Sequence, residues 1–346
     1  MDPGPVSKVY ANQVGGHPGV ATTEDGSLLI KPSLPREVAF YQALATDARC
    51  ANLRDFVPEF YGTLKLEGRV ANEGGGLMNA ITPVEESIVL ENLAYTFLKP
   101  NILDIKLGTV LFDEDATPEK RARMEKVAEE TTSKETGMRL TGFQVYDLAA
   151  DKPVITTKAY GKSIKPADLP DGIARFFPLA APPSPPNESA QLTPSAGAAH
   201  GTGLPPELLQ TILAGILSEV EDIYGTMEDI ELRMVGGSLL LVYEADWDRA
   251  REGLRLLREA EQRAEREVEQ GQEQDEDEDE DGEEDDDENA VGPPFVVKLI
   301  DFAHAKLVPG RGPDEGVLHG LRTVIDLLKG RMAQVEAVSV TTLTST

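Results

Sequence analysis

The sequence predicts an α+β fold with two structural units, and three observations support this prediction. The 346 residues, of which 40% are apolar, are enough to bury more than one sizeable core. Segments with strand character and segments with helical spacing both occur along the chain. The first hundred residues combine several short strands with one helix, so we expect a small unit at 1–98 and a larger one at 99–346.

The first unit is predicted to be a small sheet that carries one helix. Turn residues alternate with a short apolar run in NQVGGHPGVATTEDGSLLIKP, a pattern typical of a hairpin, and this one would end near Lys31. A helix follows from Arg36, since Val38, Tyr41 and Ala45 recur at helical spacing. Two further strands are predicted at FYGTLKLEG and SIVLENL.

The second unit begins with the predicted strand NILDIKLG and continues with a charged helix. Thr117 is suited to cap that helix, and Pro118 to occupy its first position. Later segments predict a helix at PELLQTILAGILSEVEDIYG, two strands at ELRMVGGSLLLVYEAD, a solvated helix from Asp248, a strand at PFVVKLI and a final helix at DEGVLHGLRTVIDLLKGRMAQV. Two inserts interrupt this unit: a flexible, proline-rich one at 181–206 and a disordered acidic one at 270–290.

The charge and cysteine content limit the classes of protein to which this chain could belong. A formal net charge of −28 argues against binding nucleic acid through phosphate neutralisation, because that mode needs a basic surface. Much of the charge is local, since thirteen of the fourteen residues from Asp275 to Glu288 are acidic. The single cysteine, Cys50, cannot form an internal disulfide, which suits a reducing compartment. With no apolar run of membrane-spanning length and no signal-peptide pattern, we expect a soluble intracellular protein.

The strand PNILDIKLG places an acid and a base on one of its two faces. Residues two apart on a strand point to the same side, so Asp104 and Lys106 share one face while Leu103, Ile105 and Leu107 face a core. This arrangement suits a catalytic pair. An ordinary surface ion pair is the alternative, and it would contribute at most about 1 kcal/mol.

A second stretch, KLIDFAHA, ends an apolar strand with Asp301 and places His304 three residues later. An acid at the end of a buried strand needs compensation. A Mg²⁺ ion held between this carboxylate and the phosphates of a nucleotide would supply it, as in kinases. The alternative is a capping or salt-bridged aspartate with the histidine packed nearby.

Two earlier segments are consistent with a nucleotide site. Lys31 ends a predicted strand and Glu37 lies on the following helix, as expected for a lysine that touches nucleotide phosphates and is oriented by a glutamate. The segment VLENL has the character of a connector between two lobes, where backbone groups of Glu91 and Leu93 could meet an adenine.

At this point the chain resembles the inositol polyphosphate kinase family. PNILDIKLG, from Pro100 to Gly108, fits the family signature Pro-x-x-x-Asp-x-Lys-x-Gly. Two later family motifs match GGSLL, with Ser238, Leu239 and Leu240, and IDFAH, which ends at His304. Within the family the chain is most similar to the fungal multikinases.

The resemblance implies a two-lobed, kinase-like fold with a small antiparallel sheet in the N-lobe, a larger C-lobe and a helical inositol-phosphate-binding segment at 114–137. It implies that Asp104 and Lys106 orient and activate the attacking hydroxyl and stabilise the transferring phosphoryl group. It also implies that Asp301 holds the metal and that His304 approaches the substrate. Ser238 is expected to position neighbouring groups.

A substrate ring with several phosphates needs a cationic pocket, and the helix after the signature can supply it. Lys120, Arg123 and Lys126 fall within one arc of the helix of about 120°. The resemblance implies that they bind the substrate, although a solvated helix face is the alternative. Lys158 and Arg36 are further candidates, and Arg36 could instead pair with a neighbouring acid.

We therefore expect a kinase that uses ATP and Mg²⁺ to phosphorylate soluble inositol tris- and tetrakisphosphates. The alternatives are a trisphosphate 3-kinase, a hexakisphosphate kinase, or a scaffold whose acidic segment recruits basic partners such as transcription factors. A compact front end of 99 residues before Pro100 favours the multikinase. We expect a monomer in nucleus and cytoplasm that does not bind nucleic acid directly and has no membrane-spanning segment.

Overall fold

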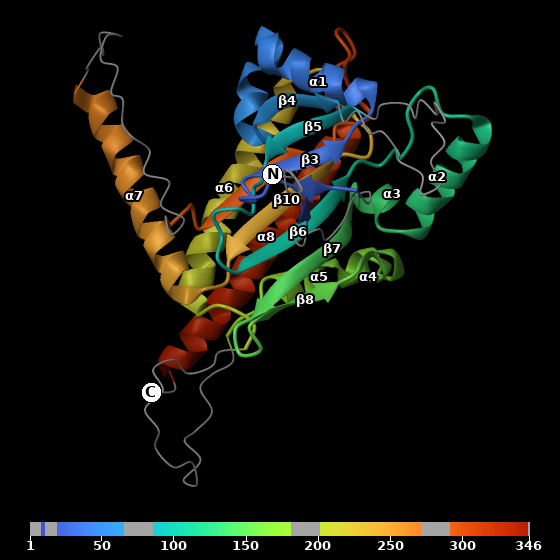
Figure 1. Cartoon of the computed structure of the whole chain (residues 1–346). Coiled ribbons are helices and arrows are strands. Elements are labelled where there is room, and N and C mark those ends of the chain that lie inside the picture. Colours follow the sequence, from blue (N-terminus) through green and yellow to red (C-terminus); the bar gives the residue numbers. More distant parts are fainter. Residues whose placement is uncertain (1–7, 11–18, 66–85, 181–200, 271–290, 345–346) are drawn as a thin grey trace, which may run out of the picture.

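The computed structural model describes residues 8–10, 19–65, 86–180, 201–270 and 291–344. The acidic run at Asp275–Glu288 and most of the proline-rich insert lie outside these ranges, so what we expect of them stays a prediction. The described residues form two five-stranded sheets and a set of helices that pack mainly on the second sheet (Figure 1). This is the predicted α+β fold.

The first sheet is antiparallel, with the strand order β1-β2-β3-β5-β4. Its strands are β1 (Lys8–Val9), β2 (Ala21–Thr22), β3 (Leu28–Pro32), β4 (Phe60–Lys65) and β5 (Glu86–Glu91). The hairpin of β2 and β3 ends beside Lys31, as predicted. α1 (Pro35–Thr46) and the 3₁₀ helix η1 (Ala48–Phe56) complete this small unit.

The second sheet is also antiparallel and has the order β11-β10-β6-β7-β8. Its strands are β6 (Pro100–Leu107), β7 (Met138–Asp147), β8 (Lys152–Thr156), β10 (Ser238–Glu244) and β11 (Phe295–Ile300). The signature strand β6 is therefore central, between the two later motif strands and β7. A separate pair joins β9 (Leu232–Met234) to β12 (Ala305–Leu307).

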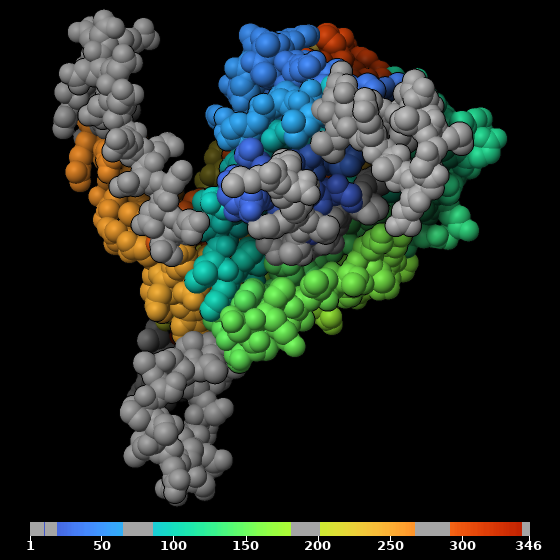
Figure 2. All heavy atoms as spheres, in the orientation of Figure 1, coloured from blue at the N-terminus to red at the C-terminus, as the bar shows by residue number. Residues whose placement is uncertain are grey.

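Two long helices, α6 (Pro206–Asp229) and α8 (Glu315–Thr344), cover one face of the second sheet. The other helices of the larger unit are α2 (Pro118–Glu130), α3 (Ser133–Thr136), α4 (Lys158–Ser163), η2 (Pro166–Asp168), α5 (Leu169–Phe176) and α7 (Trp247–Gln270). α6 and α8 pack against each other and against this sheet (Figure 1). The first turns of α7 pack on β10 and α6, with Ala250 and Leu254 in the core, and its later part extends away from the rest of the molecule (Figure 2). No helix in the described ranges is both long and apolar enough to span a bilayer.

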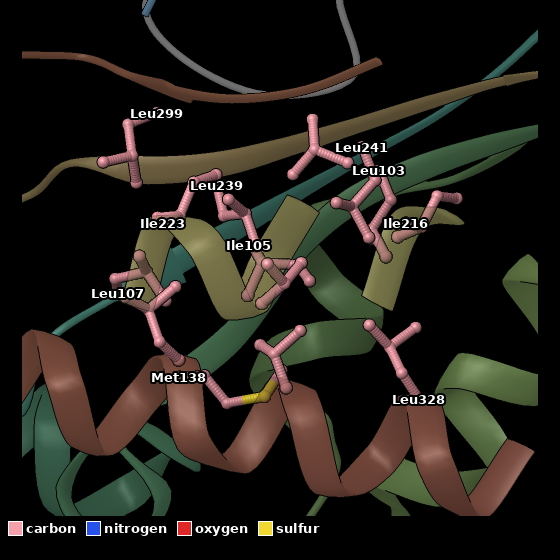
Figure 3. Close-up of a cluster of buried hydrophobic side chains, with 14 of the residues drawn as sticks. Leu103, Ile105, Leu107, Met138, Ile216, Ile223, Leu239, Leu241, Leu299 and Leu328 are labelled. Carbon is pink, nitrogen blue, oxygen red and sulfur yellow. The ribbon is translucent and has the colours of Figure 1, made fainter. Parts of the chain in front are cut away.

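The alternation on β6 divides the sheet into a core face and a polar face. Leu103, Ile105 and Leu107 are fully buried against α6 and α8, as the sequence predicts (Figure 3). Asp104 lies on the opposite face but is only 3% exposed. Lys106 pairs with Asp301 on that face, so the alternative of a surface ion pair between Asp104 and Lys106 is wrong.

Candidate active site

A lysine, a glutamate and an aspartate from three elements meet where the two sheets face each other. Lys31 lies on β3, Glu37 in the first turn of α1, and Asp301 directly after β11. The Lys31 Nζ atom lies 2.8 Å from Glu37 Oε1 and 2.8 Å from Asp301 Oδ1. Burial acts to lower the pKa of Lys31, but Asp301 and Glu37 outweigh it and raise that pKa. The lysine therefore stays charged and links the two sheets.

Glu37 is held in place by the way in which α1 begins. Pro35 lies at the start of the helix, where its missing N–H does no harm. A carboxylate in the first turn interacts favourably with the helix dipole. The Ser33 hydroxyl donates to Glu37 Oε2 at 3.1 Å, and the residue is 1% exposed. Glu37 is thus a fixed anchor for the lysine.

Asp301 has a backbone conformation that is uncommon for a residue other than glycine. Its φ is 67°, in the left-handed region, which costs of order 1–3 kcal/mol. The next residue, Phe302, is fully buried, and its ring stacks on Phe40 of α1 at 4.6 Å. We infer that this packing holds the strained turn. It directs the Asp301 carboxylate to the two lysines.

Asp104 and Lys106 lie on the central strand beside this group. The Lys106 Nζ atom donates to the Gly236 carbonyl at 2.6 Å and lies 3.7 Å from Asp301 Oδ2. Asp104 Oδ1 has no hydrogen-bond partner among the described residues. Burial raises the pKa of Asp104 to about 6, although Lys106 opposes the rise. A buried carboxylate with a free oxygen is suited to accept a proton from a ligand.

The donor set fits Mg²⁺ with phosphates as the remaining ligands. The described residues contain no group of three or more acids, histidines and cysteines that could hold a metal by themselves. Mg²⁺ is commonly bound by one or two carboxylates together with substrate phosphates and water. Asp301, whose side chain is 23% exposed, supplies a carboxylate of that kind.

The connector between the sheets, residues 92–99, is organised by Asn92. Its Nδ2 atom donates to the Gly26 carbonyl at 2.7 Å, and its Oδ1 atom accepts from the Ala94 N–H at 3.2 Å. Ala94 and Phe97 pack on Ile102 and neighbouring residues of the second sheet. The neighbours of Asn92 in sequence are Glu91 and Leu93, the two residues predicted to meet an adenine.

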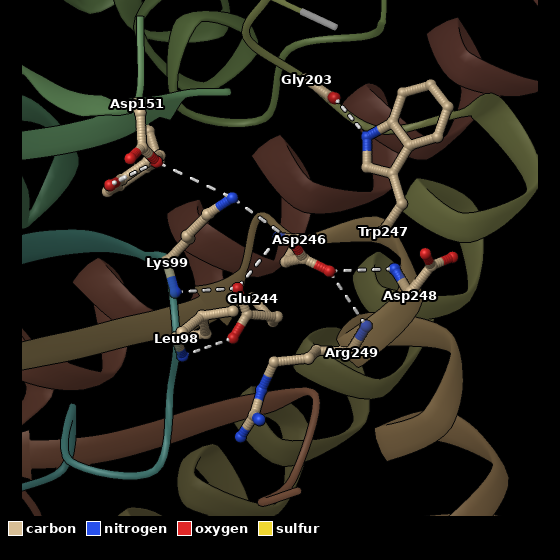
Figure 4. A network of polar contacts seen from close by, with 10 residues as sticks. Leu98, Lys99, Asp151, Gly203, Glu244, Asp246, Trp247, Asp248 and Arg249 are labelled. Atoms are coloured by element: carbon tan, nitrogen blue, oxygen red, sulfur yellow. Dashed lines mark hydrogen bonds and ion pairs between the residues drawn. The ribbon is translucent and has the colours of Figure 1, made fainter. Parts of the chain in front are cut away.

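A buried acid fixes the other end of this connector (Figure 4). Glu244 is 3% exposed and accepts hydrogen bonds from the backbone N–H groups of Leu98 at 2.8 Å and Lys99 at 3.0 Å. Burial raises the pKa of Glu244, and the backbone donors oppose that effect. Arg249 of α7 also donates to the Thr96 carbonyl. The connector is thereby tied to the second sheet and to α7.

The helix after the signature presents its cations outward. The Thr117 side chain caps α2 by accepting from the Lys120 N–H at 3.2 Å, as predicted. Arg123 and Lys126 are exposed, Lys120 is half-buried, and Lys126 lies 3.6 Å from Glu130. Within the described part of the chain, Lys120 and Arg123 form no ion pair. They are therefore available to an anion, while Lys126 is partly neutralised.

Arg36 and His304 both contact acids of the loop before α2. Arg36 lies 2.5 Å from Asp115 and 3.8 Å from Asp113, and His304 Nδ1 lies 2.9 Å from Asp113 Oδ2. For Arg36 this is the alternative expected from the sequence, pairing with a neighbouring acid. A cavity of about 840 Å³ adjoins these pairs, and Arg36, Asp113 and His304 line it. His304 thus faces a space large enough for a small ligand.

The remaining residues predicted from the sequence lie on or beside the strands of the second sheet. Ser238 is fully buried and lies opposite Lys106 on β10, while Leu239 points to the core and Leu240 lies opposite Asp104. Pro100 begins β6, and Gly108 follows it with a φ of 100°, which favours glycine. Lys158 is exposed on α4, which packs on β7.

Sequence reasoning missed Asn92 and Glu244, which fix the connector. Each is a polar residue within or beside an apolar run, and that is the signal that could have revealed them. A polar residue at such a position must find partners when it is buried. Its partners here are backbone groups distant in sequence, Gly26 for one and Lys99 for the other, so the pairing itself could not be predicted.

Comparison with known proteins gives a consistent result. The sequence model of the family described as inositol polyphosphate kinase matches residues 87–329. The inositol polyphosphate multikinase of Saccharomyces cerevisiae is 32% identical over 370 residues, which cover 92% of this chain and 97% of that protein. The multikinase of Schizosaccharomyces pombe is 32% identical over 179 residues, which cover 49% of this chain and 63% of that protein.

A solved structure has the same fold. It is the inositol phosphate multikinase Ipk2 of S. cerevisiae in complex with ADP and Mn²⁺. It superposes with a TM-score of 0.58 at 28% sequence identity, over 89% of this chain and 100% of that one. The two-lobed, kinase-like architecture predicted from the motifs is thereby confirmed.

Proposed function

Because the chain belongs to the inositol polyphosphate kinase family, we propose that it transfers the γ-phosphoryl group of ATP to ring hydroxyls of inositol tris- and tetrakisphosphates. One observation supports this above all others. Lys31, Lys106 and Asp301 form one connected group of charges, with the buried Asp104 beside it on the central strand. Transfer between oxygens needs this combination of fixed cations and a proton acceptor.

We assign the nucleotide to the side of Lys31. This lysine, oriented by Glu37, would bind nucleotide phosphates, and the backbone of Glu91 and Leu93 would contact the adenine. Asp301 would hold Mg²⁺, which would neutralise charge on the phosphates of the nucleotide. The Mn²⁺ and ADP in the yeast Ipk2 structure support this assignment of cofactors.

Asp104 and Lys106 are assigned to the transfer itself. As the bond from the ring oxygen to phosphorus forms and the bond from phosphorus to ADP breaks, Asp104 accepts the proton of the ring hydroxyl. With its pKa at about 6, it is mostly ionised at neutral pH and can accept a proton. Lys106 stabilises the negative charge on the transferring group, an effect that is greatest in the transition state.

The acceptor is assigned to the cations near α2. Lys120 and Arg123 would bind phosphates of the inositol ring, with Lys126 and Lys158 as weaker contacts. His304 faces the cavity beside the loop before α2 and would reach the substrate from that side. Arg36 would contribute only if it left Asp115.

The decisive experiment is an assay of the purified protein with ATP, Mg²⁺ and a panel of inositol phosphates, with product isomers resolved. We expect phosphorylation of more than one trisphosphate or tetrakisphosphate hydroxyl. A single product from a trisphosphate would indicate a 3-kinase instead, and turnover of the hexakisphosphate would indicate a hexakisphosphate kinase. Failure to phosphorylate any of these compounds would refute the proposal.

We further propose that the protein is a monomer of nucleus and cytoplasm whose acidic segment, Asp275 to Glu288, binds basic proteins such as transcription factors. Support comes from its charge alone, thirteen carboxylates in fourteen positions. Replacing the segment with a Gly-Ser linker should leave turnover within about twofold of wild type, because the entropic cost of closing a loop changes little with its length. Salt-sensitive capture of a basic partner should be lost. Unchanged capture would exclude this role.

A further inference from the structure

Four buried polar atoms without hydrogen-bond partners gather on the polar face of the second sheet. Within the described residues they are Asp104 Oδ1, Ser238 Oγ, Thr141 Oγ1 and Arg139 Nη1. Buried polar atoms in folded proteins are nearly always paired with protein or ordered water, so a group of unpaired ones in one place indicates a site for a ligand or for water. Asp104 and Ser238 lie on the motif strands β6 and β10, whereas Arg139 and Thr141 lie on β7, which no family motif covers.

The strand register places Arg139 beside the catalytic group. Ser238 on β10, Lys106 on β6 and Arg139 on β7 lie opposite one another across three neighbouring strands. Residues that oppose each other in antiparallel strands project to the same face. Thr141 is the extra residue at the register shift beside Asp104. The guanidinium therefore shares the face of the sheet on which Asp104 and Lys106 lie.

Two other partly buried arginines among the described residues, Arg233 and Arg331, are satisfied by backbone carbonyls. Arg233 donates to the carbonyls of Gly312 and Arg311, each at 2.8 Å. Arg331 donates to Phe177 through Nε and Nη2. Arg139 is also half-buried, and the charge of Asp104 acts on it, yet its Nη1 atom has no hydrogen-bond partner among the described residues. A guanidinium has five donors in a planar fork, and burying such donors without hydrogen-bond partners is costly unless an anion binds them.

We propose that Arg139 binds a phosphate group of the inositol phosphate substrate. An arginine fork matches the oxygens of a phosphate in a bidentate way, which a lysine cannot do. The inference rests on the proposed function. It adds to the cations of α2 a contact that comes from the sheet itself.

The order of the strands assigns Arg139 to the substrate and not to ATP. Asp301, the proposed metal ligand, follows the edge strand β11, whereas Arg139 lies on the other side of β6. Lys106 on β6 lies between them. Arg139 also follows α3 directly, and α3 packs on α2, which carries Lys120 and Arg123. A phosphate held there is on the acceptor side of the transferring group.

The test compares Arg139→Met with Lys134→Met, which removes an exposed cation five residues earlier on α3. Steady-state kinetics with an inositol trisphosphate and ATP give both Michaelis constants, and calorimetry gives the dissociation constant of the trisphosphate. We expect Arg139→Met to raise the constants for the trisphosphate at least tenfold and to change that for ATP less than twofold. Lys134→Met should match wild type. Wild-type constants in Arg139→Met would overturn the inference.

A structural role for Arg139 would give a different pattern. If the role were structural, Arg139→Met would lower the melting temperature and raise the Michaelis constants for both substrates alike. If Arg139 contacts a phosphate, the variant and the wild type should bind equally well a bisphosphate that lacks this one phosphate. If Arg139→Met fails to fold, Arg139→Gln is judged by the same criteria. Wild-type protein that neither binds nor phosphorylates the trisphosphate would refute the proposed function. An active wild type with an unaffected Arg139 variant would refute only this inference.

Discussion

Replacing Asp104 with asparagine should abolish turnover and at the same time stabilise the protein. The side chain is 3% exposed, and one of its oxygens has no partner among the described residues. An ionised carboxylate in this position is unfavourable, as the rise of its pKa from 3.8 to about 6 indicates. Asparagine has nearly the same shape but no charge, and it cannot take the proton of the attacking hydroxyl.

The size of the gain follows from the shift in pKa between the unfolded and the folded chain. The pKa of Asp104 is higher in the folded chain than in the unfolded chain. The protein therefore has its full stability below the unfolded pKa of this group, and it loses stability as the pH rises through the folded pKa. One pKa unit corresponds to about 1.4 kcal/mol, so the wild type loses up to about 3 kcal/mol above pH 6. The uncharged amide of the Asp104→Asn variant avoids this loss. The gain should be about 3 kcal/mol at pH 8 and about half of that at pH 5.

The assay is denaturant unfolding of wild type and Asp104→Asn without ligands at about pH 8 and about pH 5. Glu114→Gln is a control of opposite sign. Glu114 is exposed and pairs with Lys306 and Arg311, which lower its pKa to about 2, so its loss should not stabilise the protein. An Asp104→Asn protein that is no more stable than wild type at pH 8 would refute the reasoning. So would a gain that does not depend on pH.

Three further predictions concern the other charged groups. Asp301→Asn should remove turnover at saturating Mg²⁺ without unfolding the protein, because an amide is a poor ligand for this ion; near-normal activity would exclude Asp301 from the metal site. Lys106→Ala should mainly lower kcat, whereas Lys31→Ala should mainly raise the KM for ATP, and identical kinetics in the two variants would contradict this division. Lys120→Ala and Arg123→Ala should each raise the KM for inositol phosphate about tenfold, since charge-assisted contacts contribute roughly 1.5–3 kcal/mol; wild-type values would indicate a solvated helix face.

The sequence by itself was sufficient to predict the main helices and strands and to identify the residues to which we assign the chemistry. Strand alternation placed Leu103 and Ile105 in the core and Asp104 on the opposite face, because a strand has only two faces. Thr117 and Pro118 located the start of α2, since capping depends on residues close in the chain. The motif around Asp104 and Lys106 led to the family for the same reason: all its members lie within nine residues.

Only the tertiary structure decided how these residues meet and which of them are buried. Lys31 and Asp301 are 270 residues apart in sequence, yet their charged atoms lie 2.8 Å apart because the end of β11 reaches the first sheet. The burial of Asp104, which raises its pKa, depends on what covers the polar face of the second sheet. Likewise, no local pattern could show that Arg139 Nη1 lacks a hydrogen-bond partner, because its neighbours on β6 and β10 are fixed by strand order and register. Long-range pairing is settled by the packing of the whole chain, and local sequence does not encode it.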